Sequence, residues 1–277
     1  MNAKQSILWG SAALAAGAAG AMLLGRAASA RRLHDDVARL FADAADPSRH
    51  IYREAQLVGL PAPVKRYFRH VLPDGRPYLR GLRLRHDGQF KPNLKKEWVR
   101  ITGEEYMTAC PPGFIWQGTT SQFTARDAYE DGHGRLAVHL LGLVPVLHGE
   151  GPTYDDGELL RWLTETVLMP TALLPSDELC WIDLDDESAR LLFRHRGRSV
   201  ACIVRFNAAN EIEECEALRH QGEAGLQTWV GRFLHYRAWH GVRAPSVLEA
   251  SWVIDGHRQP YAQFAVRELE YDQLKAF

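Results

Sequence analysis

Apolar and polar residues alternate along much of this 277-residue chain, and short turns separate the alternating segments. Leu82 and Leu84, for example, alternate with Arg83 and Arg85, a pattern typical of a β-strand with one covered face and one wet face. Short connections favour antiparallel neighbours, because parallel strands need long crossovers. About a dozen strands are more than a flat open sheet usually carries, so we expect the sheet to curl. The predicted strands span residues 82–85, 97–102, 106–110, 114–117, 122–130, 135–141, 180–184, 189–195, 199–206, 211–219, 247–255 and 261–271.

One stretch, residues 157–175, interrupts the alternation and predicts a helix. Ahead of it, Asp155 and Glu158 match a variant of the capping box, in which side chains satisfy the free amides of the first turn. Pro170 lacks an amide hydrogen, so the helix should end or kink there. Nearly the whole circumference is apolar, as in a helix that is covered on most sides. The sequence therefore predicts an α+β half-barrel, in which a curved antiparallel sheet wraps around a central apolar helix, residues 158–169.

The first 32 residues contain an apolar run from Ile7 to Leu24, about 18 residues without a charge, which is long enough to cross a bilayer as a helix. Residues 28–30 resemble a signal-peptidase site, so a cleaved secretory signal is the main alternative to an uncleaved anchor. Arg26 lies between the run and that site and favours the anchor. We therefore predict a single-pass N-terminal anchor in the cell membrane, with residues 7–24 as the membrane contact. The sequence is compatible with the rest of the chain lying on either side of the membrane.

The residues after the anchor divide into a linker and one domain. Two predicted helices, residues 33–45 and 47–60, form the linker. Val64, Tyr67, Phe68 and Val71 then mark a short amphipathic helix that ends before Pro73. The expected division is a membrane anchor or signal segment over residues 1–32, a helical linker over residues 33–60, and a single α+β half-barrel domain over residues 61–277.

Composition and missing motifs exclude several classes of function. A net charge of -1 provides no field for attracting nucleic acid, so we expect no nucleic-acid partner. None of the four cysteines forms a Cys-x-x-Cys pair, and none of the 12 histidines has the helical spacing of metal ligands. The sequence also lacks a nucleophile elbow, a phosphate-binding glycine loop and a dinucleotide fingerprint. We therefore predict neither a metal nor a cofactor.

The turn at residues 207–210 predicts how the two strands around it pair. If Asn210 takes the left-handed conformation, Phe206 lies opposite Ile212, which is a favourable apolar pair. In that register Cys202 and Cys215 project from opposite faces of the sheet. We therefore expect both cysteines to be free thiols.

Three charged residues of the predicted helix, Glu158, Arg161 and Glu165, lie three or four positions apart on one side. A partly buried carboxylate held by Arg161 would act as a general acid or base, or as a polar anchor inside an apolar cavity. The alternative is a structural network in which these residues, with sheet residues such as Arg126 or Asp127, satisfy one another.

The aromatic residues of the predicted strands and helix either line a cavity or fill a core. Trp116, Trp162 and Trp181 belong to a larger set that would surround a hydrophobic ligand against the helix. The same residues would equally form a packed interior. We take these three tryptophans, together with the charged residues of the helix, as the candidate ligand-binding residues. The neighbouring Glu104 and Glu105 are interpreted as a surface feature at the start of a strand.

Five runs of the sequence carry a resemblance to known proteins: LPAPVKRYF at 60–68, ITGEEY at 101–106, PPGFIW at 111–116, GELLRW at 157–162 and PTALLP at 170–175. Over nearly all of the chain after about Ala55, it resembles an uncharacterised bacterial membrane-anchored family of unknown function. The resemblance implies a fold similar to the lipoprotein-carrier (LolA-like) half-barrel, a curved antiparallel sheet closed by helices that shields acyl chains. It implies no activity, substrate or cofactor. Because the tethering segment departs from a freely diffusing carrier, local lipid handling is expected rather than shuttling.

These observations favour three functions. The first is a membrane-anchored protein that binds a hydrophobic or lipid-like ligand between the curved sheet and the helix, with Arg161 orienting a polar headgroup. The second is a hydrolase that uses Glu158 or Glu165 as an acid-base residue. The third is a non-enzymatic scaffold with a solid interior. The first function requires an open space beside Arg161, Trp162 and Glu165, whereas the third requires that side chains fill this space.

Overall fold

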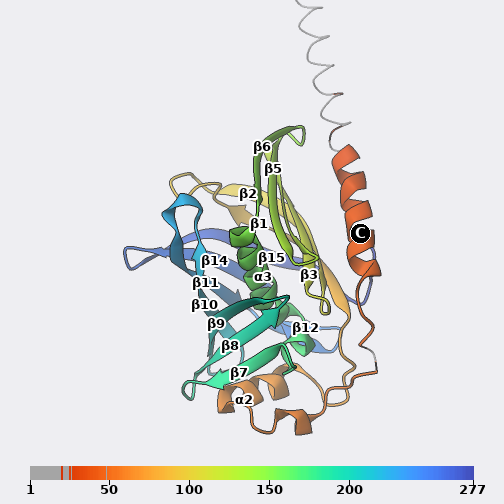
Figure 1. The fold of residues 1–277 in the computed structure, drawn as a ribbon, viewed down its shortest axis with the longest axis vertical. Helices are drawn as coiled ribbons and strands as arrows, with labels where there is room; N and C mark the ends of the chain where they lie inside the picture. The colour runs from red at the N-terminus through yellow and green to blue at the C-terminus, as the bar shows by residue number, and fades with distance from the viewer. Residues whose placement is uncertain (1–19, 21–24, 26, 48) are drawn as a thin grey trace, which may run out of the picture.

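The computed structural model describes residues 20, 25, 27–47 and 49–277, whose arrangement Figure 1 shows. Thirteen strands form one sheet in which every neighbouring pair is antiparallel, as the sequence predicted for a curved half-barrel. A separate hairpin contains β12 (Arg237–Trp239) and β13 (Val242–Ala244). The strands of the large sheet are β1 (Gly81–Phe90), β2 (Val99–Thr108), β3 (Gly113–Thr119), β4 (Phe123–Glu130), β5 (His133–Leu140), β6 (Val144–Glu150), β7 (Leu179–Asp183), β8 (Ser188–His195), β9 (Arg198–Phe206), β10 (Ile212–His220), β11 (Leu226–Leu234), β14 (Val247–Ile254) and β15 (His257–Tyr271).

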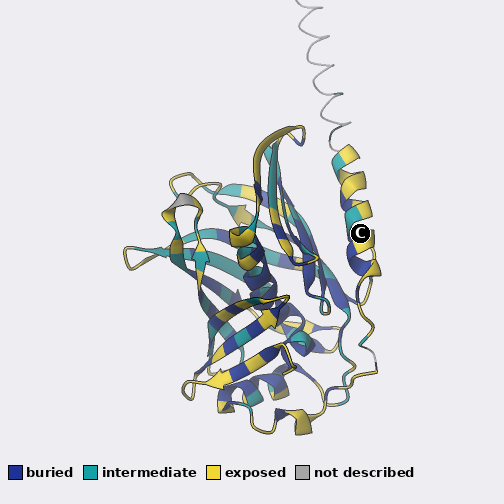
Figure 2. Ribbon diagram, in the orientation of Figure 1, coloured by how far each residue is buried: buried dark blue, intermediate teal, exposed yellow. Residues whose placement is uncertain are grey.

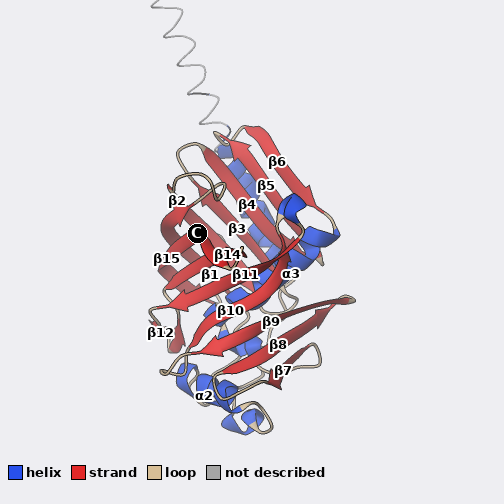
Figure 3. Cartoon of the chain, turned by 90° about the vertical axis from the view of Figure 1, so that its left-hand side faces the viewer, coloured by secondary structure: helices blue, strands red, loops and turns tan. Residues whose placement is uncertain are grey.

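The order of the strands places the first and last strands of the chain at the centre of the sheet. The order is β6-β5-β4-β3-β2-β1-β15-β14-β11-β10-β9-β8-β7, so the sheet has two arms that end at β6 and β7. The helix α3 (Pro152–Glu165) connects these two edge strands and packs against β4, β5 and β6 of one arm and β9 and β10 of the other. Figure 3 shows the sheet curving past α3. The connection thus holds the two arms at a fixed separation.

The bounds of α3 differ from the predicted helix, residues 158–169. The helix begins at Pro152, which needs no amide partner in the first turn, and Gly151 provides no side-chain cap. The predicted capping box of Asp155 and Glu158 is therefore wrong. Beyond Glu165 the chain continues as two 3-10 turns, η2 (Thr166–Leu168) and η3 (Pro170–Leu173).

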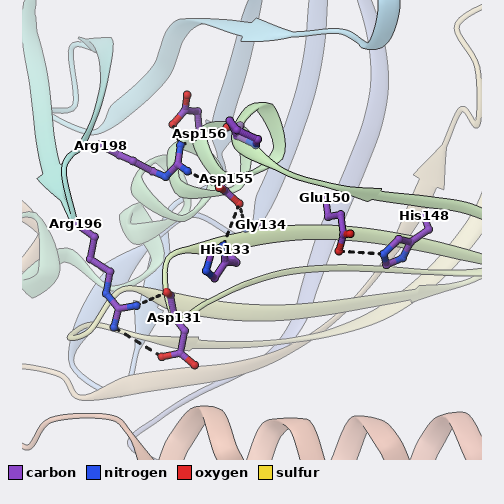
Figure 4. Close-up of polar contacts among 10 residues, drawn as sticks. Asp131, His133, Gly134, His148, Glu150, Asp155, Asp156, Arg196 and Arg198 are labelled. Carbon is purple, nitrogen blue, oxygen red and sulfur yellow. Dashed lines mark hydrogen bonds and ion pairs between the residues drawn. The ribbon is translucent and has the colours of Figure 1, made fainter.

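Asp155 instead fixes the first turn of α3 to both arms of the sheet. Its Oδ1 accepts a hydrogen bond from the Gly134 amide of β5 at 2.8 Å. Its Oδ2 binds Arg198, the first residue of β9, and the same guanidinium donates to Asp156 at 2.8 Å. Figure 4 shows these contacts between the helix and the neighbouring strands. The Asp155 side chain, which the sequence predicted as a helix cap, thus connects α3 to two strands.

The residues before the sheet only partly follow the expected linker. Residues 27–42 are helical and pack on the outer face of the sheet through an apolar cluster. The predicted helix over residues 47–60 is wrong, since among the described residues of this range only η1 (Glu54–Leu57) is helical. Instead, the backbone amide of Tyr52 donates to the carbonyl of Arg76, and the backbone amide of Tyr78 donates to the carbonyl of His50. The outer cluster consists of Leu33, Val37, Leu40, Phe41, Tyr106, Ile115 and Ala128.

The helix α2 (Ala62–Val71) confirms the amphipathic pattern, because Val64, Tyr67, Phe68 and Val71 are all buried. The predicted membrane contact, residues 7–24, lies outside the described residues apart from Gly20. Within the described part of the chain, none of the helices combines the length and the apolar character needed to cross a bilayer.

The strand pairing after the turn at 207–210 corrects the predicted register. Phe206 pairs with Ile212 as expected, but a bulge before Glu214 shifts the later pairs by one residue, so that Cys215 lies opposite Val204. Cys202 and Cys215 are therefore both buried, and they are close enough to share a hydrogen bond that raises the pKa of the Cys215 thiol. The prediction that they project from opposite faces is wrong, although both are free thiols.

Candidate functional site

A cavity of about 750 Å³ lies beside α3, between the two arms of the sheet. Its volume falls within the range of about 300–1,000 Å³ that small-molecule sites occupy. One side of its wall comes from β1 and β4–β6, and the other from β11, β14 and β15. The apolar lining residues include Phe90, Phe123, Ala125, Leu136, Val138, Leu140, Val146 and Leu147 on the first side, and Trp229, Ala250, Trp252, Tyr261, Ala262 and Phe264 on the second.

The register of three neighbouring strands builds the polar end of this cavity. Glu105 of β2 lies opposite Trp116 of β3, which lies opposite Asp127 of β4. Directly paired residues share one face of a sheet, so the two carboxyl groups flank the indole ring. The side chains of Glu158, Arg161 and Glu165 extend from α3 to the same region. Asp127, Glu158 and Glu165 line the cavity, and Glu105 is bound to Arg161 without lining it; we call these four residues the acidic floor.

Arg161 lies at the centre of the acidic floor. Its Nη1 is 2.5 Å from Asp127 Oδ2, its Nε is 3.0 Å from Glu165 Oε1, and its Nη2 is 3.5 Å from Glu105 Oε1. The guanidinium carbon also lies 5.1 Å from the centre of the Trp116 ring, a cation–π contact. Burial opposes the charge, but the surrounding carboxylates outweigh it and raise the pKa of Arg161. The guanidinium is thus permanently charged and already paired.

Several carboxyl oxygens of the acidic floor lack such partners. Within the described part of the chain, Asp127 Oδ1 and Glu158 Oε2 are buried without a hydrogen-bond partner, whereas Glu165 is close enough to Glu105 for their carboxyl groups to share one. Burial raises the pKa of Glu158 to about 8 and also raises the pKa of Asp127. Burial, followed by the nearby Glu165, raises the pKa of Glu105 well above its usual range. The floor therefore contains buried carboxyl oxygens that lack partners, and Glu158 keeps its proton near neutral pH.

A second arginine supports the floor from the opposite arm. Arg219 of β10 lies with its Nη2 3.8 Å from Glu158 Oε1 and its guanidinium 5.2 Å from the centre of the Trp229 ring. The Trp229 indole in turn donates to the Tyr261 hydroxyl at 2.9 Å. Four carboxyl groups thus face two guanidinium groups, an excess of acidic side chains.

An uncharged stack closes the cavity wall beside Trp116. The Trp116 indole donates to His86 Nε2 at 2.8 Å, and the His86 ring stacks on Phe264 with 4.3 Å between ring centres. Burial, with help from Arg161, lowers the pKa of His86 to about 4, so the ring is neutral at physiological pH. Gly103, opposite His86 on β2, leaves room for this ring, because a Cβ there would collide with it.

The structure brings together four of the six residues that the sequence proposed for the site. Glu158, Arg161, Glu165 and Trp116 line the cavity. The other two lie in the main apolar core instead. Trp162 donates to the carbonyl of Thr108 at 2.9 Å, and Trp181 donates to the carbonyl of Leu173 at 2.9 Å.

Sequence reasoning did not include Glu105 and Arg219 in the site. The interpretation of Glu105 as a surface residue is wrong, because it is 4% exposed in the middle of β2. The signal was present: Ile101, Gly103, Glu105 and Met107 share the inward side of one strand, so a glutamate there must be buried. Splitting β2 into two predicted strands concealed that alternation.

Among the described residues, no group of three or more His, Cys, Asp or Glu side chains is arranged to hold a metal ion.

Comparisons with known proteins identify a family but no activity. The family described as "Family of unknown function (DUF6544)" matches residues 50–264. No curated protein matches the sequence. Among solved structures, a LolA superfamily protein from Nitrosomonas europaea is similar with 9% sequence identity and a TM-score of 0.36, over 76% of this chain and 94% of that one. A DUF1329 family protein from Desulfovibrio piger is similar with 10% identity and a TM-score of 0.36, over 83% of this chain and 95% of that one.

Proposed function

We infer the function from the geometry of the cavity, because the chain belongs to DUF6544, a family of unknown function. The protein binds a hydrophobic or lipid-like small molecule between the two arms of the sheet and α3, and residues 7–24 hold it at a membrane. The observation that carries this proposal is a cavity of about 750 Å³ whose walls are apolar and whose inner end is the acidic floor. An amphiphile has the same division into an apolar body and a polar end.

The acidic floor selects the polar end of the ligand. Carboxyl oxygens of Asp127, Glu158 and Glu165 accept hydrogen bonds, so they favour a ligand head that donates, such as a hydroxyl or an ammonium group. A carboxylate head would lose its hydration beside groups that offer it no compensation, because the guanidinium groups of Arg161 and Arg219 are already paired with carboxyl groups of the floor. Arg161 is fully engaged by Glu105, Asp127 and Glu165, so we assign it the role of positioning these carboxyl groups.

Competition between amphiphiles of equal length tests this proposal. Protein containing residues 27–277 is titrated with the fluorescent apolar probe N-phenyl-1-naphthylamine, which is then displaced by dodecylamine, dodecanol or dodecanoate. The first two should displace the probe at concentrations at least about tenfold lower than dodecanoate, a difference of ~1.4 kcal/mol.

A pair of alanine variants shows whether the probe occupies the cavity. Ala250→Trp fills the lining, so it should weaken probe binding by at least about tenfold. Ala201→Trp makes the same change at an exposed position of β9 and should leave binding unaltered. Equal binding by both variants would exclude the cavity as the site.

A hydrolase that uses Glu158 or Glu165 as an acid-base residue is a second candidate, and one observation favours it. Burial raises the pKa of Glu158 to about 8, so the carboxyl group keeps its proton near neutral pH and suits a general acid. Activity found in a broad substrate screen should fall in Glu158→Gln or in Glu165→Gln, and unchanged activity in both variants would remove this candidate. The open cavity argues against the third function, a scaffold with a solid interior.

A further inference from the structure

The turn between β5 and β6 carries an exposed apolar surface. Residues 140–147 read LLGLVPVL and contain no charged or polar side chain. Soluble proteins rarely leave a contiguous patch of this kind exposed unless it contacts a partner or a membrane. Six of its side chains are 39–56% exposed, namely Leu140, Leu141, Leu143, Val144, Val146 and Leu147. We call residues 140–147 the apolar tip.

The apolar tip is continuous with the cavity wall. Leu140, Val146 and Leu147 line the cavity while remaining partly exposed, whereas Leu143 lies in the turn and Val144 begins β6. Figure 2 shows the β5–β6 hairpin extending past the rest of the sheet with exposed residues along it. An apolar ligand that leaves the cavity along β5 and β6 therefore reaches the tip without crossing a charged surface.

The start of the N-terminal helix lies beside the apolar tip. The helix over residues 27–42 is fixed to the outer face of the sheet, because Arg126 of β4 binds Asp36 at 2.6 Å and the carbonyl of Ser29 at 3.2 Å. Gly25 lies directly against the Leu143 side chain. The ribbon in Figure 1 shows the beginning of this helix and the hairpin at the same end of the molecule.

The sequence on either side of this point favours a lipid surface as the occupant. The uncharged run Ile7–Leu24 directly precedes Gly25 in the chain. Arg31 and Arg32 are exposed in the first turns of the helix, where basic side chains interact favourably with anionic lipid headgroups. Apolar side chains beside basic ones are the composition of elements that bind in a membrane interface.

We propose that the apolar tip of the β5–β6 hairpin inserts into the surface of a lipid bilayer, and that the ligand moves between the bilayer and the cavity along this hairpin. The route of the ligand rests on the proposed function. The docking of the tip does not, because it depends only on the exposed residues and on their place beside Gly25.

Quenching by brominated lipids tests the docking. The full chain carries Cys110→Ser and Cys180→Ser, which remove its exposed thiols, and a bimane label on Val144→Cys. It is reconstituted with vesicles of phosphatidylcholine and phosphatidylglycerol that have brominated acyl chains. The matched control labels Val58→Cys, which is 85% exposed and precedes α2 at the opposite end of the molecule.

The label at residue 144 should be quenched at least about threefold more strongly than the label at residue 58, because bromine quenches only within the acyl region. Equal quenching at both positions overturns the docking. A label at residue 144 that is shielded without lipid, in a self-associated form of the protein, also overturns it, since the tip would then bind a second copy of the chain.

A charged variant tests the route. Leu143→Asp combined with Val144→Asp should slow the transfer of a phospholipid with a fluorescent acyl chain from vesicles to the full-length protein by about tenfold, while the amount bound at equilibrium stays the same. Leu218→Asp, at a 63% exposed position of β10, should leave the rate unchanged. Equal rates in both variants overturn the route. If no variant and no wild-type protein binds lipid, the proposed function fails with the route, and the quenching result still decides the docking.

Discussion

Arg161 is surrounded by three carboxyl groups and by the rings of Phe114 and Trp116, so its guanidinium is the shared partner of three of the four residues of the acidic floor. Glu165 comes from the same helix, whereas Glu105 and Asp127 come from two strands of the sheet. Removing one partner of a buried ion pair leaves an uncompensated charge, which costs about 3–5 kcal/mol. Arg161 therefore holds the helix and the sheet together while it orients the carboxyl groups toward the cavity.

The stability of the protein should depend on the ionisation of Glu158. Burial raises the pKa of this group from 4.5 to about 8, so the folded protein keeps a proton that the unfolded chain releases between these values. The contribution to the free energy of unfolding is complete below pH 4.5 and is lost as the pH rises to about 8. Glu158→Gln cannot ionise and should lose this dependence.

Urea unfolding at pH 5 and pH 8 measures the effect. When the pH rises from 5 to 8, the free energy of unfolding of wild type should fall on the order of 2 kcal/mol further than that of Glu158→Gln. Glu97→Gln alters an exposed glutamate and serves as the control. A stability difference between wild type and Glu158→Gln that is constant across this range would contradict the assignment.

At the residue scale, the sequence predicted the members of α3 better than those of the sheet. Glu158, Arg161 and Glu165 share one face of a helix, and helical spacing alone places them together. Glu105 and Asp127 join them only through the pairing of β2, β3 and β4, which depends on the register. The indole nitrogens of Trp162 and Trp181 bond to backbone carbonyls, and no local pattern separates such core tryptophans from Trp116.

Among the elements, α3 has the largest influence on the site, because it connects the two edge strands and carries half of the acidic floor. Its first turn is bound to β5 through Gly134 and to β9 through Arg198, in both cases by Asp155. These bonds join the first turn of the helix to both arms of the sheet.

Asp155→Ala should therefore destabilise the protein by about 2–3 kcal/mol, since it leaves the Gly134 amide unpaired and removes a buried charge-assisted bond. Asp156→Ala is the matched control at the next position. It bonds to the same arginine, but its side chain is 53% exposed, so its loss should cost less than about 1 kcal/mol. Thermal unfolding compares the two variants. Equal losses of stability would show that Asp155 does not connect α3 to the two strands.

Local features explain why the sequence predicted some elements wrongly or not at all. Pro152 begins α3 without a side-chain cap, so the search for capping residues placed the start too late. The bulge before Glu214 adds one residue to β10, which reverses the face of every later side chain and brings Cys202 and Cys215 together. The strand β6 escaped prediction because its apolar residues are nearly all exposed and do not alternate.

At the scale of the whole molecule, the half-barrel followed from the number of strands and from their short connections. A sheet of thirteen strands with one helix between its edge strands leaves an inner space that side chains fill only in part. The sequence did not decide between a cavity and a packed interior, because the same aromatic residues suit both. Their division depends on the curvature of the sheet: Trp229 and Trp252 line the cavity, whereas Trp162 and Trp181 fill the core.

Native mass spectrometry of the full-length protein, extracted in a mild detergent, tests the binding of an amphiphile most directly. Wild-type protein should carry a bound molecule whose mass, after dissociation in the gas phase, matches a lipid or a related amphiphile. Ala250→Trp should reduce the occupied fraction by at least about tenfold, because the new ring takes up the space between the arms. Repeated spectra of wild-type protein that contain only the unoccupied chain would contradict the proposed function.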